Sequence, residues 1–296
     1  MKKIKLDNFM HQKYITGLKA SPDEKHVAIT VFTPDIVSND YLASIWVFDC
    51  ITSDYHELTF FDSSAPFIWL DAETILYPAL KDENLQKRIE LGEQWTVYNA
   101  VNIKSKETKE FMRIPLFVSD LRSIGGNEFL LTAMYDHYGI NLNTLTGKER
   151  ESAIQLIKES KDYEVLDEVP FWSNVDGYTN KKRNRLYTYN KKNGSISAIS
   201  GKFENILIED QKDGKILYIS EHFENISDLT NSLHLYNTHT GENMCILDND
   251  KGYMLNAAVF LGNTIVVCGI DDAFHNLLVK NNRFYIVEEG NLKLLA

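Results

Sequence analysis

Short apolar segments recur along this chain at an interval close to 48 residues, and that repeat restricts its fold more than any other feature. Each segment is about four to seven residues long, rich in Ile, Val, Tyr and Phe, and bounded by turn residues, which is typical of β-strands. We therefore expect an all-β protein built from a repeated unit. The predicted strands include 26–32, 44–48, 74–77, 128–133, 185–189, 215–219, 232–236, 264–268 and 283–287.

A turn motif of the form Asn-x-x-[Thr/Asn]-Gly marks the same point in three repeats. It occurs at 143–147, 190–194 and 237–241, and successive copies are 47 residues apart. The Asn side chain can accept a hydrogen bond from the backbone two residues further on, and Gly readily adopts the positive φ that closes a tight turn. The motif therefore predicts a hairpin turn in each of these repeats.

A second series of apolar residues lies at the start of the strand that follows a turn, with spacings of 48, 54, 87 and 49 residues. We interpret the spacing of 87 as nearly two periods, with one unit whose second strand is atypical and which holds segment 170–177. The residues of this series are Val27, Ile75, Phe129, Ile216 and Ile265.

A period of about 40–50 residues with four strands per unit is typical of a β-propeller, in which stacked sheets cover each other's faces. A β-sandwich is the alternative, but it gives no reason for the 47-residue interval to be kept. We predict a single β-propeller domain over residues 1–296. Its six four-stranded units are expected at 15–62, 63–113, 114–150, 151–200, 201–248 and 249–296.

Two segments interrupt the strand pattern. Segment 81–93 is highly charged, and segment 151–162 carries apolar residues at positions 153, 154, 156 and 157, a spacing that favours a short surface helix. We expect both to be loop or helix excursions on one rim of the propeller.

The charge and hydropathy of the chain exclude several classes of protein. Its formal net charge is -11, which argues against nucleic-acid binding, since that needs a concentrated positive field. No stretch approaches the roughly 18 consecutive apolar residues of a membrane span, and the N-terminal residues lack the apolar region of a secretory signal. We expect a cytoplasmic protein that contacts neither nucleic acid nor membrane. The three cysteines have apolar neighbours and are expected to be buried thiols: Cys50, Cys245 and Cys268.

The common catalytic motifs are missing from the sequence. It contains no G-x-S-x-G nucleophile elbow, no H-E-x-x-H metal motif, no phosphate-binding P-loop and no G-x-G-x-x-G. Asp271, Asp272 and His275 form a possible ligand group, but the other histidines are dispersed. We therefore predict no catalytic residue, no metal site and no cofactor in this chain.

Three polar segments supply candidate binding residues, because aromatic side chains in loops beside polar groups are suited to ligand binding. In the segments YDHYG (135–139) and PFWSN (170–174), the aromatic residues can equally cap the ends of the sheets. The basic segment KKRNR (181–185) is either a hairpin tip facing water or a contact to an acidic partner or substrate carboxylate. The candidates are Tyr135, Asp136 and His137, then Phe171, Trp172 and Asn174, and finally Arg183 and Arg185.

Several longer segments are distinctive as a set, and they extend along most of the chain. The most specific is YEVLDEVPFWSNVDGYTNKKRNRLYTY at 163–189. Together they resemble the N-terminal propeller of acylaminoacyl-peptidase-like enzymes, in the prolyl oligopeptidase family of serine peptidases. The supporting segments are 21–30, 67–83, 92–99, 110–116 and 134–141.

The resemblance implies a seven-bladed propeller that covers the active site of a C-terminal α/β-hydrolase domain with a Ser-Asp-His triad. Such a cover admits short peptides and excludes folded proteins, and family members remove N-acylated residues or cleave oligopeptides. This sequence has no hydrolase segment before Ala296 and six visible units, so no triad residue can be transferred to it. We expect a substrate-gating propeller that is not catalytic alone and that acts on short or N-acylated peptides together with a hydrolase domain.

Two other functions and one further partner stay open at this point. An independent propeller that scaffolds other proteins would have the same fold, because propellers host many functions. A metal-dependent lyase with its site in the central funnel would need convergent His and carboxylate ligands. A six-unit ring that does not close would expose an apolar face, which favours a homo-oligomer.

Overall fold

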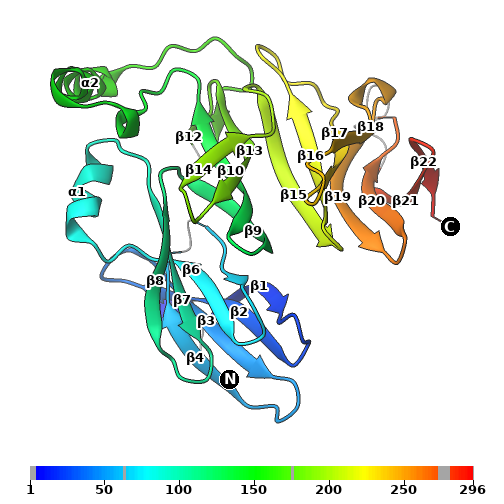
Figure 1. Ribbon diagram of the computed structural model, residues 1–296, viewed down its shortest axis with the longest axis horizontal. Coiled ribbons are helices and arrows are strands. Elements are labelled where there is room, and N and C mark those ends of the chain that lie inside the picture. Colours follow the sequence, from blue (N-terminus) through cyan, green and yellow to red (C-terminus); the bar gives the residue numbers. More distant parts are fainter. Residues whose placement is uncertain (1–4, 63–64, 175–176, 273–280, 296) are drawn as a thin grey trace. The chain divides into compact units, whose positions relative to one another are not determined.

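The structure is a computed structural model that describes residues 5–62, 65–174, 177–272 and 281–295. It divides into two compact units, Met1–Ser123 and Ile124–Ala296, and antiparallel sheet dominates both (Figure 1).

The first unit holds two four-stranded sheets. A 3-10 helix, η1 (Leu6–His11), precedes the first sheet, and helix α1 (Glu83–Glu90) connects two strands of the second. The first sheet has the order β1 (Tyr14–Ala20), β2 (His26–Asp35), β3 (Asp40–Asp49), β4 (Tyr55–Phe60). The second sheet has the order β5 (Ile68–Trp69), β6 (Thr74–Pro78), β7 (Thr96–Asn102), β8 (Thr108–Ile114).

The second unit contains most of the third sheet and all of the fourth and fifth. The third sheet consists of β9 (Val118–Gly125), β10 (Glu128–Asp136), β13 (Lys182–Asn190) and β14 (Ser195–Ala198), in the order β14-β13-β10-β9. The fourth has the order β15 (Glu204–Lys212), β16 (Lys215–His222), β17 (Ser232–Asn237), β18 (Asn243–Leu247). After η4 (Asn249–Lys251), the fifth has the order β19 (Met254–Leu261), β20 (Thr264–Ile270), β21 (Arg283–Glu288), β22 (Asn291–Leu294).

Neighbouring sheets bury apolar residues against each other, as stacked propeller blades must. In the first unit, Ala28, Ile45 and Val47 of the first sheet pack with Ile75 and Tyr77 of the second. In the second unit, the fourth sheet is covered on both faces. Successive side chains along a strand point to opposite faces of the sheet, so neighbouring residues can pack against different sheets. Its Ile216 belongs to the cluster with the third sheet, and its Leu217 belongs to the cluster with the fifth.

The predicted propeller architecture is confirmed, but the strands are distributed differently from expectation. Six sheets lie within the described residues; five have four strands, and the sixth is a hairpin of β11 (Trp172–Ser173) with β12 (Gly177–Tyr178). The units expected at 114–150 and 151–200 contribute to one sheet, the third. The spacing of 87 residues is therefore one period enlarged by an insertion, residues 137–181, between β10 and β13.

The turn motif is confirmed in two of its three copies. Asn190 and Asn237 each accept a hydrogen bond from the backbone N–H two residues on, at 2.9 Å, and the glycine of each motif has a φ of +72° or +74°. The prediction of a hairpin at 143–147 is wrong. There the chain has already left β10 for the insertion, so it forms η2 (Leu142–Thr144) and then helix α2.

Both predicted excursions are present. Helix α1 begins after Asp82, whose carboxylate accepts hydrogen bonds from the N–H groups of Asn84 and Leu85 at 3.0 and 3.1 Å, a standard N-cap. Helix α2 (Gly147–Glu159) starts four residues earlier than expected, and η3 (Ser160–Asp162) follows it.

The prediction of buried cysteines is wrong. Cys50 and Cys245 are exposed and Cys268 is half-buried. Cys50 follows the last residue of β3, and Cys245 lies on β18, the outermost strand of its sheet, where apolar neighbours in sequence do not imply burial. Within the described residues, no helix is long and apolar enough to cross a membrane.

Gly269 marks a close approach of two strands in the fifth sheet. A Cβ at this position would lie 2.3 Å from the carbonyl oxygen of Met254 and 3.0 Å from the Cα of Leu255, both on the paired strand β19. Because backbone atoms cannot move aside cheaply, we expect Gly269→Ala to lower the free energy of unfolding by about 1–3 kcal/mol. Urea denaturation checks this, with Cys268→Ala as the neighbouring control. An unchanged midpoint in Gly269→Ala would contradict the close packing.

Candidate functional site

The insertion 137–181 is joined to the fourth sheet by backbone hydrogen bonds. The N–H of Val169 donates to the carbonyl of Asn225, and the N–H of Ser227 donates to the carbonyl of Val169, both at 2.8 Å. Val169 and Ile226 thus form a parallel bridge outside the main sheets. The end of the insertion is therefore fixed to the loop that follows β16.

A buried ion pair reinforces this junction. The Nη2 of Arg183 on β13 lies 2.8 Å from Oε2 of Glu168, its Nη1 lies 3.2 Å from Oε1, and the two side chains are 2% and 0% exposed. The same guanidinium donates to the carbonyl of Phe223 at 2.9 Å and lies 3.7 Å from the centre of its ring. Because Glu168 neutralises its charge, Arg183 holds the insertion in place instead of presenting a free cation.

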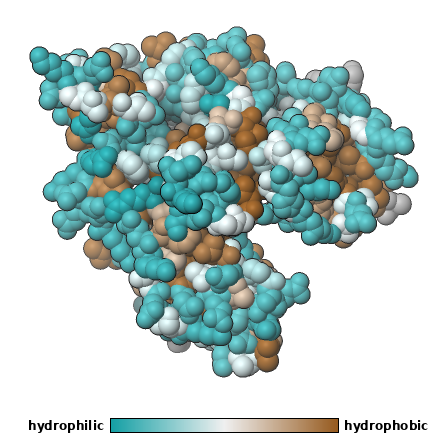
Figure 2. All heavy atoms as spheres, in the orientation of Figure 1, coloured by the Kyte–Doolittle hydropathy of each residue, from teal (hydrophilic) through white to brown (hydrophobic). Residues whose placement is uncertain are grey.

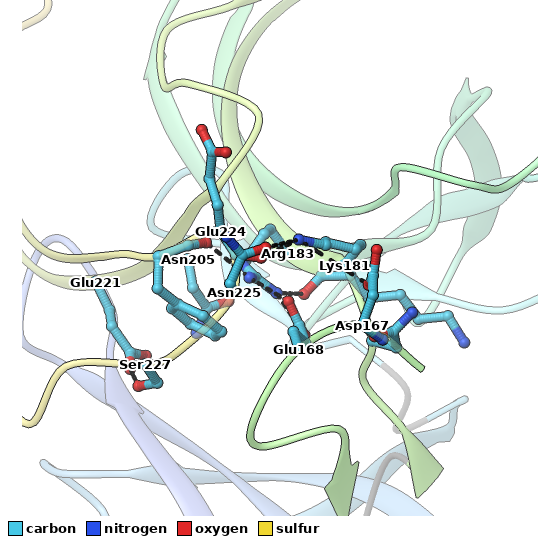
Figure 3. Close-up of polar contacts among 12 residues, drawn as sticks. Asp167, Glu168, Lys181, Arg183, Asn205, Glu221, Glu224, Asn225 and Ser227 are labelled. Atoms are coloured by element: carbon cyan, nitrogen blue, oxygen red, sulfur yellow. Dashed lines mark hydrogen bonds and ion pairs between the residues drawn. The ribbon is translucent and has the colours of Figure 1, made fainter. Parts of the chain in front are cut away.

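Lys181 and Asn180 complete the junction. Lys181 is 5% exposed, and its Nζ donates to the carbonyl of Glu224 and, at 3.1 Å, to Oδ1 of Asn225 (Figure 3). Asn180, also buried, donates to the carbonyl of Val165 at 2.8 Å. These contacts order the chain before and after the hairpin β11–β12.

The basic segment 181–185 is therefore not the water-facing hairpin tip that was one of its two interpretations. It forms the start of β13, and both Lys181 and Arg183 are buried there. The reason lies in partners that are distant in sequence: the Glu168 carboxylate of the insertion pairs with Arg183, and the loop after β16 supplies the carbonyls of Phe223 and Glu224.

A pocket of about 250 Å³ lies between the third and fourth sheets and is lined in part by the hairpin β11–β12. We call it the rim pocket. One wall comes from β10 and β13 of the third sheet, the opposite wall from β15, β16 and the following residue of the fourth sheet, and the roof from the insertion. Its lining residues are Met134, Lys182, Arg183 and Asn184; Asn205, Glu221 and Phe223; and Pro170, Trp172, Ser173, Tyr178 and Thr179.

Two of the predicted binding residues line the rim pocket, and two lie beside them in sequence. Trp172 and Arg183 belong to its lining. The Trp172 ring is half-exposed and meets the Tyr178 ring edge-on, with centroids 5.0 Å apart. Phe171 and Asn174 flank β11 and are both exposed.

The other four predicted residues form a second group on the third sheet. The guanidinium of Arg185 lies 5.0 Å from the centre of the Tyr135 ring, and the Tyr135 hydroxyl lies 3.3 Å from Nδ1 of His137. Asp136 has a structural contact, since its Oδ1 accepts from the N–H groups of Tyr138 and Gly139, both at 3.0 Å. These residues do not line the rim pocket.

Two tyrosines next to this second group have raised pKa values. Burial raises the pKa of Tyr187, and the neighbouring Arg185 cation opposes that rise. The hydrogen bond that Tyr138 donates to Asp167 raises the pKa of the Tyr138 phenol. Both phenols are therefore neutral near pH 7.

Sequence reasoning missed Lys182, Asn205 and Glu221. Asn205 and Glu221 pair across β15 and β16, 24 and 40 residues after the insertion ends, and the Oδ1 of Asn205 accepts from the N–H of Asn184 at 3.0 Å. No short motif connects such distant positions. The repeat itself was the one usable signal for these positions, since it places the end of the second strand of each sheet at the same rim.

No protein-family model matches the sequence, and no curated protein matches it. Solved structures do match. The acylaminoacyl peptidase of Pyrococcus horikoshii is 12% identical with a TM-score of 0.65, over 98% of this chain and 40% of that one. The β-propeller domain of the Trilobed protease from Pyrococcus furiosus is 16% identical with a TM-score of 0.55, over 95% of this chain and 71% of that domain. A structure of prolyl endopeptidases is 12% identical with a TM-score of 0.54, over 95% of this chain and 35% of that one.

The chain has the fold of a peptidase β-propeller. The resemblance to the propellers of the prolyl oligopeptidase family is thereby confirmed at the level of the fold. The chain spans 40% of the length of the acylaminoacyl peptidase. The Pyrococcus furiosus domain is described as having an open velcro topology.

Proposed function

We propose that this chain is the substrate-selecting propeller of a cytoplasmic serine peptidase that acts on short or N-acylated peptides. The observation that carries the proposal is the rim pocket in a fold shared with peptidase propellers. The pocket is small, aromatic on one side and lined by amide groups, which suits a peptide end or side chain. It is the feature through which this chain would select peptides.

An exposed apolar surface beside the pocket supports docking of a catalytic domain outside this chain. Large apolar side chains are exposed on both segments that meet at the Val169–Ile226 bridge. Exposed apolar side chains that gather on segments held together in this way are typical of interaction sites. We call this surface the apolar rim; it consists of Tyr163, Val165, Leu166, Val169, Phe171, Ile226 and Leu229.

The alternatives differ in what supports them. The apolar rim would also suit an independent scaffold that binds other proteins, so the experiment below separates the two. Nothing observed favours a metal-dependent lyase: in residues 5–62, 65–174, 177–272 and 281–295, no three His, Cys, Asp or Glu side chains gather as ligands. Of the possible ligand group at 271–275, His275 lies outside the described residues.

Self-association stays a prediction of the proposal. Apolar side chains reach the surface over the fifth sheet (Figure 2). Val259, Leu261 and Phe284 of this sheet are exposed. Light scattering at high concentration measures the mass, and a dimer or larger species is the expected result. A monomeric mass would contradict it.

The proposed function predicts that this chain alone does not hydrolyse an acylaminoacyl nitroanilide. A peptidase of this type needs a nucleophile with an adjacent base and with oxyanion donors. Immunoprecipitation from the source cells should bring down nitroanilide hydrolysis together with a band labelled by a fluorophosphonate probe. The control omits the antibody. Hydrolysis by the purified chain that resists the probe, or a precipitate with no labelled band, would overturn the proposal, and the latter result would favour the scaffold.

A further inference from the structure

Two charged residues line the rim pocket, one on each of its opposite walls. Lys182 belongs to β13 of the third sheet, and Glu221 belongs to β16 of the fourth. Neither is in an ion pair among the described residues. The third charge that lines the pocket, Arg183, is already neutralised by Glu168. The lining of the pocket therefore includes one cation and one anion that are not paired with each other.

Both charged groups keep hydrogen-bonding capacity for a ligand. The Nζ of Lys182 donates one hydrogen bond, to the carbonyl of Tyr178 at 3.0 Å, and an ammonium group has three donors. One carboxylate oxygen of Glu221 accepts from the hydroxyl of Ser227, which leaves the other oxygen open (Figure 3). The Ser227 contact also holds the Glu221 carboxylate in one orientation.

Between the two charges, the lining suits an apolar side chain and a peptide unit. Trp172 and Tyr178 line the pocket on the side of the insertion, and Phe223 lines it on the side of the fourth sheet. Asn184 and Asn205 add amide groups to the lining. At about 250 Å³ the pocket is smaller than the roughly 300–1,000 Å³ of sites for drug-sized ligands. A ligand that fits must be small and must carry both charges.

We propose that the rim pocket binds a free dipeptide as a zwitterion. The terminal ammonium contacts Glu221, the terminal carboxylate contacts Lys182, and an apolar side chain packs against the aromatic roof. This rests on the proposed function and narrows it, because an N-acylated peptide has no terminal ammonium, whereas a short free peptide has one. Within the proposed substrate class, the pocket would thus select short free peptides.

Calorimetric titration with capped forms of one ligand tests the proposal on the unmodified chain at pH 7. The dipeptide Ala-Phe is expected to bind saturably. N-acetyl-Ala-Phe lacks the ammonium and Ala-Phe amide lacks the carboxylate, so each should bind about tenfold or more weakly, the usual effect of losing a hydrogen-bonded charge.

Substitutions of the two charged residues then test which of them contacts each charged end of the dipeptide. Glu221→Gln should bind Ala-Phe and N-acetyl-Ala-Phe equally weakly, and Lys182→Gln should do the same for Ala-Phe and its amide. Glu224→Gln and Lys192→Gln remove the same charges from exposed positions near the pocket and at the distant β13–β14 turn, and they should bind Ala-Phe like the unmodified chain. A thermal melt of each variant confirms that it folds.

Three results would overturn the proposal: no saturable binding of Ala-Phe, equal affinity of the unmodified chain for capped and free ligands, or equal loss in the control variants. Equal affinity for N-acetyl-Ala-Phe would leave the proposed function intact, because an N-acylated ligand would then occupy the pocket. Conversely, zwitterion binding can hold even if no fluorophosphonate-labelled peptidase accompanies the chain.

Discussion

Replacing Arg183 with methionine is expected to lower the free energy of unfolding of the second unit by about 3–5 kcal/mol. The change leaves the Glu168 carboxylate, which is 0% exposed, as an uncompensated buried charge. It also removes the hydrogen bond to the Phe223 carbonyl and the contact with the Phe223 ring. Urea denaturation followed by circular dichroism measures the loss, and hydrogen exchange should rise first in segments 165–170 and 223–231.

The double variant Arg183→Met/Glu168→Leu separates the charge from the packing. Removing both partners takes away the unpaired charge, so it should recover much of the stability lost in the single variant. Lys293→Met is the matched control, since the Lys293–Glu288 pair, at 3.2 Å, belongs to the same unit but is exposed. If Arg183→Met changed stability no more than Lys293→Met does, the ion pair would not be what fixes the insertion.

The parts of the fold that could be predicted from sequence are those set by local chemistry. Strand composition identified all nine of the apolar segments as strands, and the Asn and Gly residues of two turn motifs fixed their hairpins. The second-strand series correctly placed one residue in each of the five four-stranded sheets. These features depend on residues close together in the chain.

The insertion could not be predicted, because its order depends on partners far away in sequence. From the local sequence, Arg183 and Lys181 are expected to be exposed cations. In the structure, they donate hydrogen bonds to the carbonyls of Phe223 and Glu224, which lie 40 and 43 residues further along the chain. The spacing of 87 residues was then assigned to two units, since nothing local showed that 137–181 returns to the same sheet. The rim pocket was missed for the same reason, and only Trp172 and Arg183 of its lining were identified.

Raising the pH from 8 to 10 is expected to stabilise the first unit through Lys19. Burial, aided by the Arg122 cation and opposed by Asp120, lowers the pKa of Lys19 from 10.5 to about 8. Its Nζ donates to the carbonyl of Phe67 at 2.9 Å, a hydrogen bond that a neutral amine can also make. The folded state therefore favours the uncharged amine.

The sign follows from the two protonation states. Below pH 8 Lys19 is charged in both states, and the cost of burying that charge is fully present. Between pH 8 and 10.5 the unfolded chain binds more protons than the folded one, so the free energy of unfolding rises with pH. A shift of this size corresponds to at most about 3 kcal/mol across the whole interval. Above about pH 10 the gain is opposed, because burial raises the pKa of Tyr98 while unfolded tyrosines ionise.

Comparison with Lys19→Met isolates the contribution of this one lysine. Urea denaturation at pH 8, 9 and 10 gives the free energy of unfolding of both chains, and tyrosine ionisation cancels in the difference. The unmodified chain should gain stability relative to Lys19→Met as the pH rises. Lys13→Met, which removes an exposed lysine near the start of β1, should show no such difference. Parallel curves for the unmodified chain and Lys19→Met would show that Lys19 is hydrated in the folded state and carries its charge to the usual pH.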